Sequence, residues 1–473
     1  MFVEQEIKPM SSTNEHIAII GGGFCGLMTT VNLLRKATTP LKISLINTGY
    51  PLGRGIAYST YSSTHALNVI AGNMSAFPDK PDDFIDWVHE KDEYKNIDKA
   101  LLYRTFLPRN LYGEYIEQVW KTALVNKPAY VELNCIDDKA VDVEVGDDLV
   151  VVLLQSGKQI NATKLVIATG NSEPRDPLIP NAAFYASKAY FRNSWKGESV
   201  EANKPGKDVL IIGSGLTMVD TILGLLEKGF TGKIYSLSPH GFGILPHRHG
   251  GMKYTGLEKE LKEPYQLDEL VRLAHRHIRI VRKLGLSAEP IIDSLRPYTQ
   301  KIWQSLSLKE RKYLMSSRLR HLWGVARHRL PVHTHDLMQS LRIQNKLIVL
   351  AGNLKDINET ADGLQISYYN RKSRLNETLT VERVINCTGP ESSIKKTGNV
   401  VLQNMWKRGV LTADPLELGI NADAEDFRVI DKYGEKLPAV FTMGTNLRGM
   451  LWESTAVPEL RIQADKLAGL ILQ

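Results

Sequence analysis

Cysteine is scarce in this sequence, and its three copies lie far apart. Cys25, Cys135 and Cys387 form no C-x-x-C pair, so their spacing predicts neither a metal site nor a dithiol redox centre. No apolar run reaches the roughly 18 residues that a membrane span needs. The first fourteen residues also lack the apolar core of a signal peptide. These absences predict a cytoplasmic protein without a membrane segment.

The composition shows no bias towards a disordered, fibrous or coiled-coil chain. Hydrophobic residues make up 43% of the 473 residues and charged residues 23%, close to the averages of globular proteins. The length predicts two or three domains. The net charge of +7 suits a protein that binds anionic dinucleotides, although it would also attract nucleic acid or acidic lipid. Because no nucleic-acid motif accompanies the charge, we expect a small-molecule ligand and no nucleic-acid partner.

The N-terminal region has the pattern of a strand, a glycine turn and a helix. Apolar residues up to Ile20 run directly into G-x-G-x-x-G at Gly21, Gly23 and Gly26, and a second apolar strand follows at 42–47. In such a βαβ unit the glycines permit a tight turn, close approach of a pyrophosphate, and close packing of helix on strand. The motif in this setting predicts a dinucleotide site.

Two residues of this first unit allow more than one interpretation. Asn47 ends the second strand, where many such sites carry an acid that binds the ribose hydroxyls. An amide can also bind a hydroxyl, but Asn47 is alternatively a plain turn residue. Cys25 lies inside the phosphate loop, and we interpret it as a small packing residue and not as a nucleophile.

A second unit of the same kind begins about 190 residues later. Its strand ends in Gly213-Ser214-Gly215-Leu216-Thr217-Met218, which keeps the first two glycines and has Met218 in place of the third. No acid ends its second strand, where Ser236 and Ser238 stand, and the basic residues His247, Arg248 and His249 follow. A 2′-phosphate would meet no repulsion there, which favours NADPH, with NADH as the alternative.

The segments between and after these units predict the domain organisation. Residues 131–169 alternate apolar and polar positions and predict a small antiparallel meander, whereas 258–345 contain no convincing strand and predict a helical insertion within or attached to the second unit. The expected boundaries are 1–14 for a flexible tail, 15–178 for the first part of one domain, 206–346 for the second domain with its insertion, and 347–473 for the return to the first domain.

The insertion is strongly basic, with fourteen Lys and Arg against three Asp and Glu between residues 270 and 330. Cations and aromatics concentrate between His321 and Pro331. This segment could hold the phosphates of a nicotinamide cofactor or an acidic substrate, or it could be a solvated helix end. A proton-transfer role for His247 or His328 is the weaker hypothesis for those side chains.

The order of these units resembles the two-dinucleotide-binding flavoproteins, including Ala-Thr-Gly at 168–170 and Cys-Thr-Gly at 387–389. The runs 53–58, 67–69, 77–79 and 452–459 are similar to the FAD-NAD(P)-binding family related to flavin-dependent monooxygenases. The resemblance implies an α/β fold with two Rossmann-like domains, a discontinuous FAD domain, a meander and a helical insertion. FAD would occupy the first site and NAD(P)H the second.

The resemblance also implies which residues contact the cofactors, while no catalytic residue follows from it. The implied FAD contacts are Gly21, Gly23, Phe24, Cys25, Gly26, Asn47, Arg54, Tyr58, Asn68, Met74, Thr169, Gly170, Gly444, Thr445, Thr455 and Ala456. The implied nicotinamide-cofactor contacts are Gly213, Ser214, Gly215, Leu216 and Thr217. A helix that begins near Thr455 would stabilise the negative charge of a reduced flavin.

These observations predict an FAD-dependent oxidoreductase that NAD(P)H reduces. The leading hypothesis is a monooxygenase that acts on a small molecule through a flavin hydroperoxide. The histidine-containing fingerprint of one monooxygenase group is absent, because Tyr185, Ser187 and Phe191 stand in its place. The alternatives are a flavoprotein dehydrogenase or reductase without oxygenation, and a non-catalytic flavin- or polyanion-binding protein. The oligomeric state does not follow from the sequence.

Overall fold

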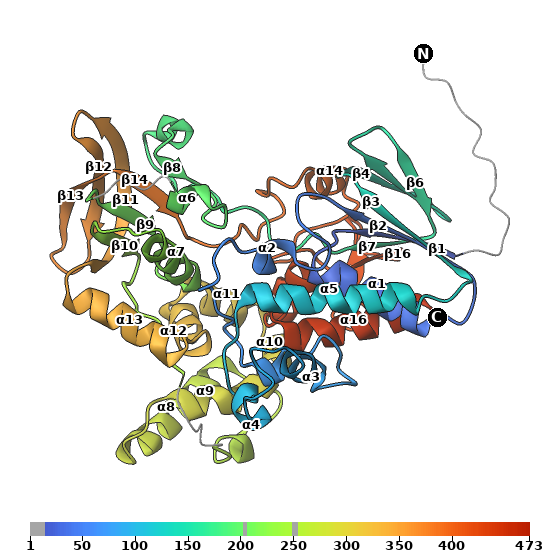
Figure 1. The fold of residues 1–473 in the computed structure, drawn as a ribbon, viewed down its shortest axis with the longest axis horizontal. Coiled ribbons are helices and arrows are strands. Elements are labelled where there is room, and N and C mark those ends of the chain that lie inside the picture. The colour runs from blue at the N-terminus through green and yellow to red at the C-terminus, as the bar shows by residue number, and fades with distance from the viewer. Residues whose placement is uncertain (1–14, 202–205, 248–253) are drawn as a thin grey trace.

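The computed structural model describes residues 15–201, 206–247 and 254–473. The expected tail at 1–14, and the cations Arg248 and His249, lie outside the described residues. Figure 1 shows two α/β units side by side, with a group of helices beneath them. Among the described residues, no helix is long and apolar enough to cross a membrane.

The first unit is built on a six-stranded sheet in the order β15-β16-β7-β1-β2-β3, parallel except for β15. Its strands are β1 (Glu15–Ile20), β2 (Leu41–Asn47), β3 (Val131–Asp137), β7 (Lys164–Ile167), β15 (Arg428–Ile430) and β16 (Lys436–Thr442). Alternate residues of β1 are buried against opposite layers, Ile17 and Ile19 in one and Ala18 and Ile20 in the other. Burial on both faces is typical of parallel sheets, which require helices or strands on each side.

Three long helices cover one face of this sheet, and a small sheet covers the other. The helices are α1 (Phe24–Lys36), α5 (Arg109–Val125) and α16 (Val457–Ile471), which pack together in one apolar core. The opposite layer consists of β4 (Ala140–Val145), β5 (Val150–Leu154), β6 (Gln159–Ala162) and α14 (Val400–Arg408). Short helices fill the connection from β2 to α5, namely α2 (Gly55–Tyr58), α3 (Asp83–His89) and α4 (Lys99–Tyr103).

The expected meander is shorter than the alternating pattern indicated. Only residues 140–162 form the antiparallel sheet, whereas β3 at the start of the pattern pairs in parallel with β2. The strand β7 at its end also belongs to the parallel sheet. The prediction for β3 was wrong because an edge strand exposes alternate residues even in a parallel sheet, as Cys135 and Asp137 are exposed here.

The second unit contains a seven-stranded sheet in the order β13-β12-β11-β10-β9-β14-β8. The strands are β8 (Tyr190–Phe191), β9 (Val209–Ile212), β10 (Ile234–Ser238), β11 (Leu347–Thr360), β12 (Gly363–Asn370), β13 (Leu375–Val381) and β14 (Arg383–Asn386). The helices α7 (Leu216–Glu227) and α13 (Val332–Ile343) cover one face. The short helix α6 (Glu198–Glu201) precedes β9.

These pairings correct the expected boundary at residue 347. The strand β11 pairs in parallel with β10, and β14 pairs in parallel with β9, so residues 347–386 lie in the second sheet. The chain returns to the first unit only after β14. The sequence pattern could not show this, because a strand's periodicity reports its burial and not which sheet it joins.

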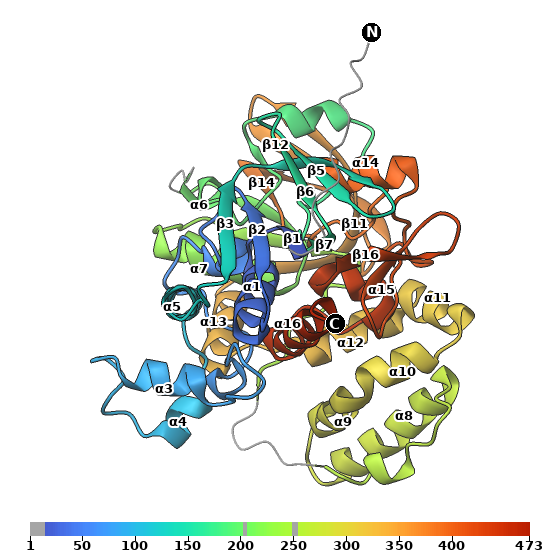
Figure 2. The same cartoon turned by 90° about the vertical axis from the view of Figure 1, so that its right-hand side faces the viewer.

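The predicted insertion is helical and lies between β10 and β11. Its helices are α8 (Leu267–Lys283), α9 (Glu289–Leu295), α10 (Thr299–Ser305), α11 (Leu308–Ser316) and α12 (Arg318–Arg327). It also contacts the first unit at α15 (Arg448–Leu451): Trp303 Nε1 donates to the Gly449 carbonyl at 2.8 Å, and the Trp303 ring stacks on Trp452. Figure 2 shows α10 and α12 near α15 and α16, so the insertion bridges both units.

A buried ion pair also joins the two units. Arg109, at the start of α5, lies 3.0 Å from Asp220 of α7, and both side chains are 12% exposed. The His65 ring donates from Nε2 to the Asp220 carbonyl at 2.8 Å. Burial raises the pKa of Asp220, while Arg109 opposes that rise. The carboxylate therefore depends on its partner to stay charged in the junction.

We expect Arg109→Met to lower the free energy of unfolding by about 3–5 kcal/mol, because it leaves a buried carboxylate without its cation. Urea denaturation followed by circular dichroism measures the change. The control is Lys95→Met, which removes the exposed pair with Asp92 and should cost less than about 1 kcal/mol. Equal losses in the two variants would show that the Arg109–Asp220 pair does not stabilise the junction.

Candidate active site

The turn between β1 and α1 requires glycine at two of its three motif positions. Gly21 has φ +105°, and a Cβ there would lie 2.3 Å from the Ala168 carbonyl oxygen. A Cβ on Gly26 would lie 1.8 Å from the Gly21 carbonyl oxygen. By contrast, a Cβ on Gly23 would meet only Gly55 Cα, at 3.8 Å. Gly23 therefore has no packing partner that demands a glycine, and its open side is where a ligand could approach the backbone.

The first turn of α1 can accept an anion. Gly23 is its N-cap, and among the described residues no side chain caps the helix and its first turn holds no acid. Its first backbone N–H groups are therefore available to a negatively charged ligand. Phe24 and Cys25 form the start of this turn. Burial raises the pKa of the Cys25 thiol to about 12, which keeps it protonated and agrees with a packing role.

Asn47 shapes the same loop. Its Oδ1 accepts from the Gly22 backbone N–H at 3.1 Å, and its Nδ2 donates to the Tyr50 carbonyl at 2.8 Å. The amide thus ties the end of β2 to the glycine turn. The contact between Asn47 and a ribose hydroxyl stays a prediction.

Residues distant in the sequence meet at this loop. Gly444 has φ +69°, and a Cβ there would lie 2.8 Å from Cys25 Sγ. Asn446 Nδ2 donates to Thr169 Oγ1 at 3.3 Å, which places the Ala-Thr-Gly segment beside the end of β16. The hydroxyls of Thr445 and Ser454 are buried and, among the described residues, have no hydrogen-bond partner. Such hydroxyls fit a site that a polar ligand such as FAD completes.

The start of α16 forms the far side of this region. Thr455 is exposed and Ala456 is the N-cap, with no capping side chain among the described residues. Gly170, with φ +67°, lines a small hollow together with Thr445 and Thr455. The predicted FAD residues near Gly21, Gly170, Gly444 and Thr455 are therefore brought to one edge of the first sheet.

Four further predicted FAD residues have structural contacts. Arg54 Nε donates to Glu117 Oε1 at 2.6 Å, and the Tyr58 ring packs on Tyr112. Met74 is 2% exposed and lies in the apolar core. The backbone of Asn68 interacts with the ring of His247, whose pKa is lowered to about 4 by burial and by Arg329. His247 is therefore neutral near pH 7, and the flavin contacts of these four residues stay predictions.

The second glycine turn repeats the geometry of the first. Gly213 has φ +120°, and a Cβ there would lie 2.4 Å from the Cys387 carbonyl oxygen. A Cβ on Gly215 would meet nothing within 4 Å among the described residues. Gly215 is the N-cap of α7, which begins with Leu216 and Thr217. Within the part of the chain that the structure describes, no side chain caps this helix and its first turn holds no acid. Ser214 lies between the two glycines.

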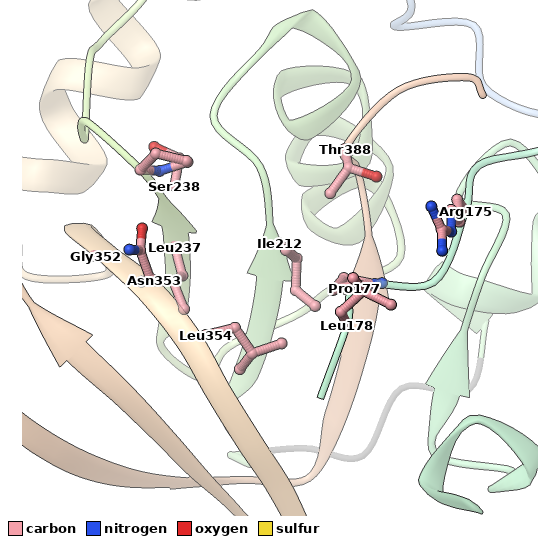
Figure 3. A pocket seen from close by; sticks show the side chains of 11 residues that line it. Arg175, Pro177, Leu178, Ile212, Leu237, Ser238, Gly352, Asn353, Leu354 and Thr388 are labelled. Carbon is pink, nitrogen blue, oxygen red and sulfur yellow. The ribbon is translucent and has the colours of Figure 1, made fainter. Parts of the chain in front are cut away.

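A pocket of about 350 Å³ lies beside this second turn. Figure 3 shows Ile212, Leu237 and Thr388 at the ends of adjoining parallel strands, with Arg175 and Asn353 at the sides of the pocket. The carboxyl edge of a parallel sheet is where dinucleotides bind. No sequence pattern indicated Arg175 or Asn353, because Arg175 lies in a connecting loop and Asn353 lies in β11, which is distant in the chain from the strand it joins.

Arg318, His240 and His321 lie beyond the end of β10, next to this pocket. The His240 ring lies 4.6 Å from the ring of His321, and Arg318 lies over Phe242. Partial burial, then Arg371 and Arg318, lower the pKa of His240. This group adjoins Ser238, which ends β10 and lines the pocket. It provides positive charge where the second strand of a dinucleotide fold meets the adenosine ribose.

Between His321 and Pro331, some side chains are held in ion pairs and others are exposed. Arg329 is buried and pairs with Asp293 at 3.0 Å, so it stabilises the insertion. Arg327 pairs with Glu453, which precedes α16, at 3.3 Å. His328 is exposed.

Comparison with known proteins agrees with this geometry. Residues 18–172 match a family model described as FAD-NAD(P)-binding. Over 320 residues the chain is 23% identical to nitrosuccinic acid synthase npaA of Aspergillus oryzae, an alignment that covers 61% of this chain. The aligned part spans 46% of that relative's own length, so the chain covers about half of it.

Solved structures share the whole fold. Ornithine hydroxylase (PvdA) from Pseudomonas aeruginosa superposes with a TM-score of 0.67 at 13% identity, covering 97% of this chain and 99% of that one. L-lysine 6-monooxygenase from Pseudomonas syringae gives 0.65 at 16% identity, covering 97% and 98%. Thioredoxin reductase from T. acidophilum gives 0.51 at 9% identity, covering 98% of each chain. Residues 18–172 therefore match the FAD-NAD(P)-binding family model, and the chain as a whole has the fold that these solved structures share.

Proposed function

We propose that this chain is an FAD-dependent monooxygenase that NADPH reduces and that acts on a small molecule with molecular oxygen. The observation that carries the proposal is the pair of matching glycine turns. Each ends a central parallel strand, opens an uncapped helix, and has one glycine, Gly23 or Gly215, whose open side has room for a phosphate. Two such sites in one chain provide for two dinucleotides, between which a hydride can pass.

The relatives support oxygenation over simple reduction. Two of the solved structures are described as a hydroxylase and a monooxygenase of amino acids. The curated relative's name denotes an acid that carries an oxidised nitrogen. By analogy, we propose that one oxygen atom of O₂ enters a nucleophilic group of the substrate and the other leaves as water. NADPH gives up a hydride and becomes NADP⁺, and the water takes up the two electrons of that hydride together with its hydrogen and one proton. A cytoplasmic location is part of the same proposal.

The chain's own residues would bind the cofactors, orient them and enclose the site. Bound FAD would supply the redox chemistry, since no side chain here transfers hydride. The N-terminus of α1 would hold the FAD pyrophosphate, and the N-terminus of α16 would stabilise negative charge on the reduced ring. The insertion, held to α15 by Trp303, would exclude water from that end of the site.

The cations near Ser238 predict a preference for NADPH. We expect Arg371→Gln to lower the ratio of kcat/KM for NADPH to that for NADH by about tenfold, because a charge-assisted bond to the 2′-phosphate would be lost. Steady-state oxidation of both cofactors measures it. Lys372→Gln, in the same exposed turn, is the control and should leave the ratio unchanged. An unchanged ratio in Arg371→Gln would place the 2′-phosphate elsewhere.

The oxygen step separates this proposal from a flavoprotein reductase. Holoenzyme reduced without oxygen is mixed with oxygenated buffer in a stopped-flow spectrophotometer, and the flavin bands are followed. A monooxygenase should return to the oxidised spectrum in two phases, through a spectrally distinct species. A reductase or dehydrogenase should instead return to the oxidised spectrum in a single fast phase. It should also form one hydrogen peroxide per NADPH, both with and without candidate amines and amino acids.

A further inference from the structure

The exposed face of α8 in the insertion carries positive charge along its length. Four cations are exposed and spaced four, three and four residues apart, which places them on one face of the helix: Arg272, Arg276, Arg279 and Lys283. The opposite face is apolar, and Val281 packs there in the core of the insertion. Ile280 and Leu284 are exposed and lie along the border between the two faces. The exposed face of α8 therefore combines a row of cations with an apolar edge.

Only the first half of this row is neutralised within the chain. Arg272 and Arg276 pair with acids of the insertion itself. In the part of the chain that the structure describes, Arg279, Arg282 and Lys283 make no ion pair with a carboxylate. Uncompensated cations beside exposed apolar side chains fit a negatively charged surface that also has apolar groups.

A hollow of about 540 Å³ lies along the same face. All the residues that line it belong to α8, and they include Arg272, Arg276 and Arg279. A single convex helix cannot enclose a small ligand, whose binding site normally buries most of the ligand's surface. The face therefore suits a macromolecule, and not a substrate or a cofactor.

A surface of the opposite charge lies on α3 and α4. Between residues 79 and 98 the sequence has eight Asp and Glu against three Lys. Asp82, Glu90 and Glu93 are exposed and make no ion pair with a cation among the described residues. The helix α4 packs on α3 and exposes Leu101 and Tyr103. This acidic surface matches the exposed face of α8 in charge and in its exposed apolar side chains.

The two surfaces lie at the same end of the molecule. Figures 1 and 2 both place α3, α4 and α8 at the lower end, and Figure 2 shows α8 apart from α3 and α4. A two-fold axis through this end would set α8 of each copy against α3 and α4 of the other, so the contact closes after two copies. Nucleic acid or an anionic lipid surface would instead meet the acidic surface at the same end, and that surface would repel it.

We propose that the chain forms a two-fold dimer in which the exposed face of α8 binds the acidic surface of α3 and α4 of a second copy. Each copy supplies both surfaces, so the same pairing occurs twice in one dimer. The 17 residues of α8 extend over about 25 Å, which presents the whole row of cations to the second copy. Because the attraction is electrostatic, the dimer should weaken as the salt concentration rises. This dimer does not depend on the proposed function.

Sedimentation velocity of the FAD-loaded full chain, over a range of protein concentrations, measures the dissociation constant of the dimer. We expect a dimer at low ionic strength. Arg279→Glu together with Lys283→Glu should raise the dissociation constant by about 100-fold, because like charges then face each other. Glu90→Lys together with Glu93→Lys should have the same effect from the other surface. All four positions are exposed, so the melting temperature should stay unchanged.

The variant with all four substitutions exchanges the charges of the two surfaces. Opposite charges then face each other again, so its dissociation constant should return to within about tenfold of the wild-type value. The control is Lys139→Glu together with Lys158→Glu, which makes the same change of charge at exposed positions beside the small sheet of β4, β5 and β6. This sheet lies at the upper end in Figures 1 and 2, so the control should leave the dimer unchanged.

Three results would overturn the proposal. The first is a wild-type chain that stays monomeric at low ionic strength, and the second is a dimer that neither pair of substitutions weakens. The third is a dimer that each pair weakens but that the exchange of charges does not restore. If the monomeric wild-type chain bound phosphatidylserine vesicles or a DNA duplex, and Arg279→Glu with Lys283→Glu abolished that binding, α8 would bind a polyanion and not a second copy.

Discussion

Gly23→Ala should give a folded protein that has lost most of its FAD. The new methyl group would meet only Gly55 Cα, at 3.8 Å, so the protein itself has room for it. In the bound state it would displace the pyrophosphate from the N–H groups at the start of α1. The loss of one charge-assisted hydrogen bond weakens binding by about 10- to 100-fold. The ratio of flavin to protein absorbance after purification measures the loss.

The control for this variant is Gly146→Ala, in the hairpin between β4 and β5. Its Cβ would make an ordinary contact of 3.4 Å with the Leu149 carbonyl oxygen, and it lies outside both glycine turns. It should keep FAD and an unchanged melting temperature. If Gly23→Ala also kept its flavin, the pyrophosphate would not bind at this turn.

Gly215→Ala should distinguish the two sites. We expect this variant to keep its FAD but to be reduced more slowly by NADPH. A Cβ on Gly215 would meet nothing within 4 Å among the described residues, so neither the fold nor the first site should change. A misplaced nicotinamide cofactor can cost about 100-fold in rate. Anaerobic stopped-flow absorbance at saturating FAD measures the rate constant. An unchanged rate and NADPH affinity would contradict the assignment of this turn.

Local sequence patterns predicted the features that depend on local residues. The two strand-glycine-helix units follow from short runs around Gly21 and Gly213, because the turn, the helix and the strand pack against one another. The helical character of the insertion was also confirmed. In each case the residues that decide the structure are neighbours in the chain.

Features that depend on distant contacts were missed. The pairing of β11 with β10 joins residues more than 100 positions apart, so the strand pattern could not assign 347–386 to the second sheet. The docking of Trp303 on α15 joins residues 146 positions apart. The basic composition of 270–330 allowed an anion site, but the fold pairs Arg327 with Glu453 and Arg329 with Asp293.

We expect one chain to hold two dinucleotides and to pass hydride from the second to the first. To test this, FAD-loaded wild-type protein is mixed with NADPH in the absence of oxygen, and the flavin absorbance is followed. The oxidised flavin band should disappear, at a rate that saturates with NADPH, and should disappear more slowly in Gly215→Ala. A flavin that stays oxidised in the wild-type protein at saturating NADPH and NADH would contradict it and leave a binding protein as the better explanation.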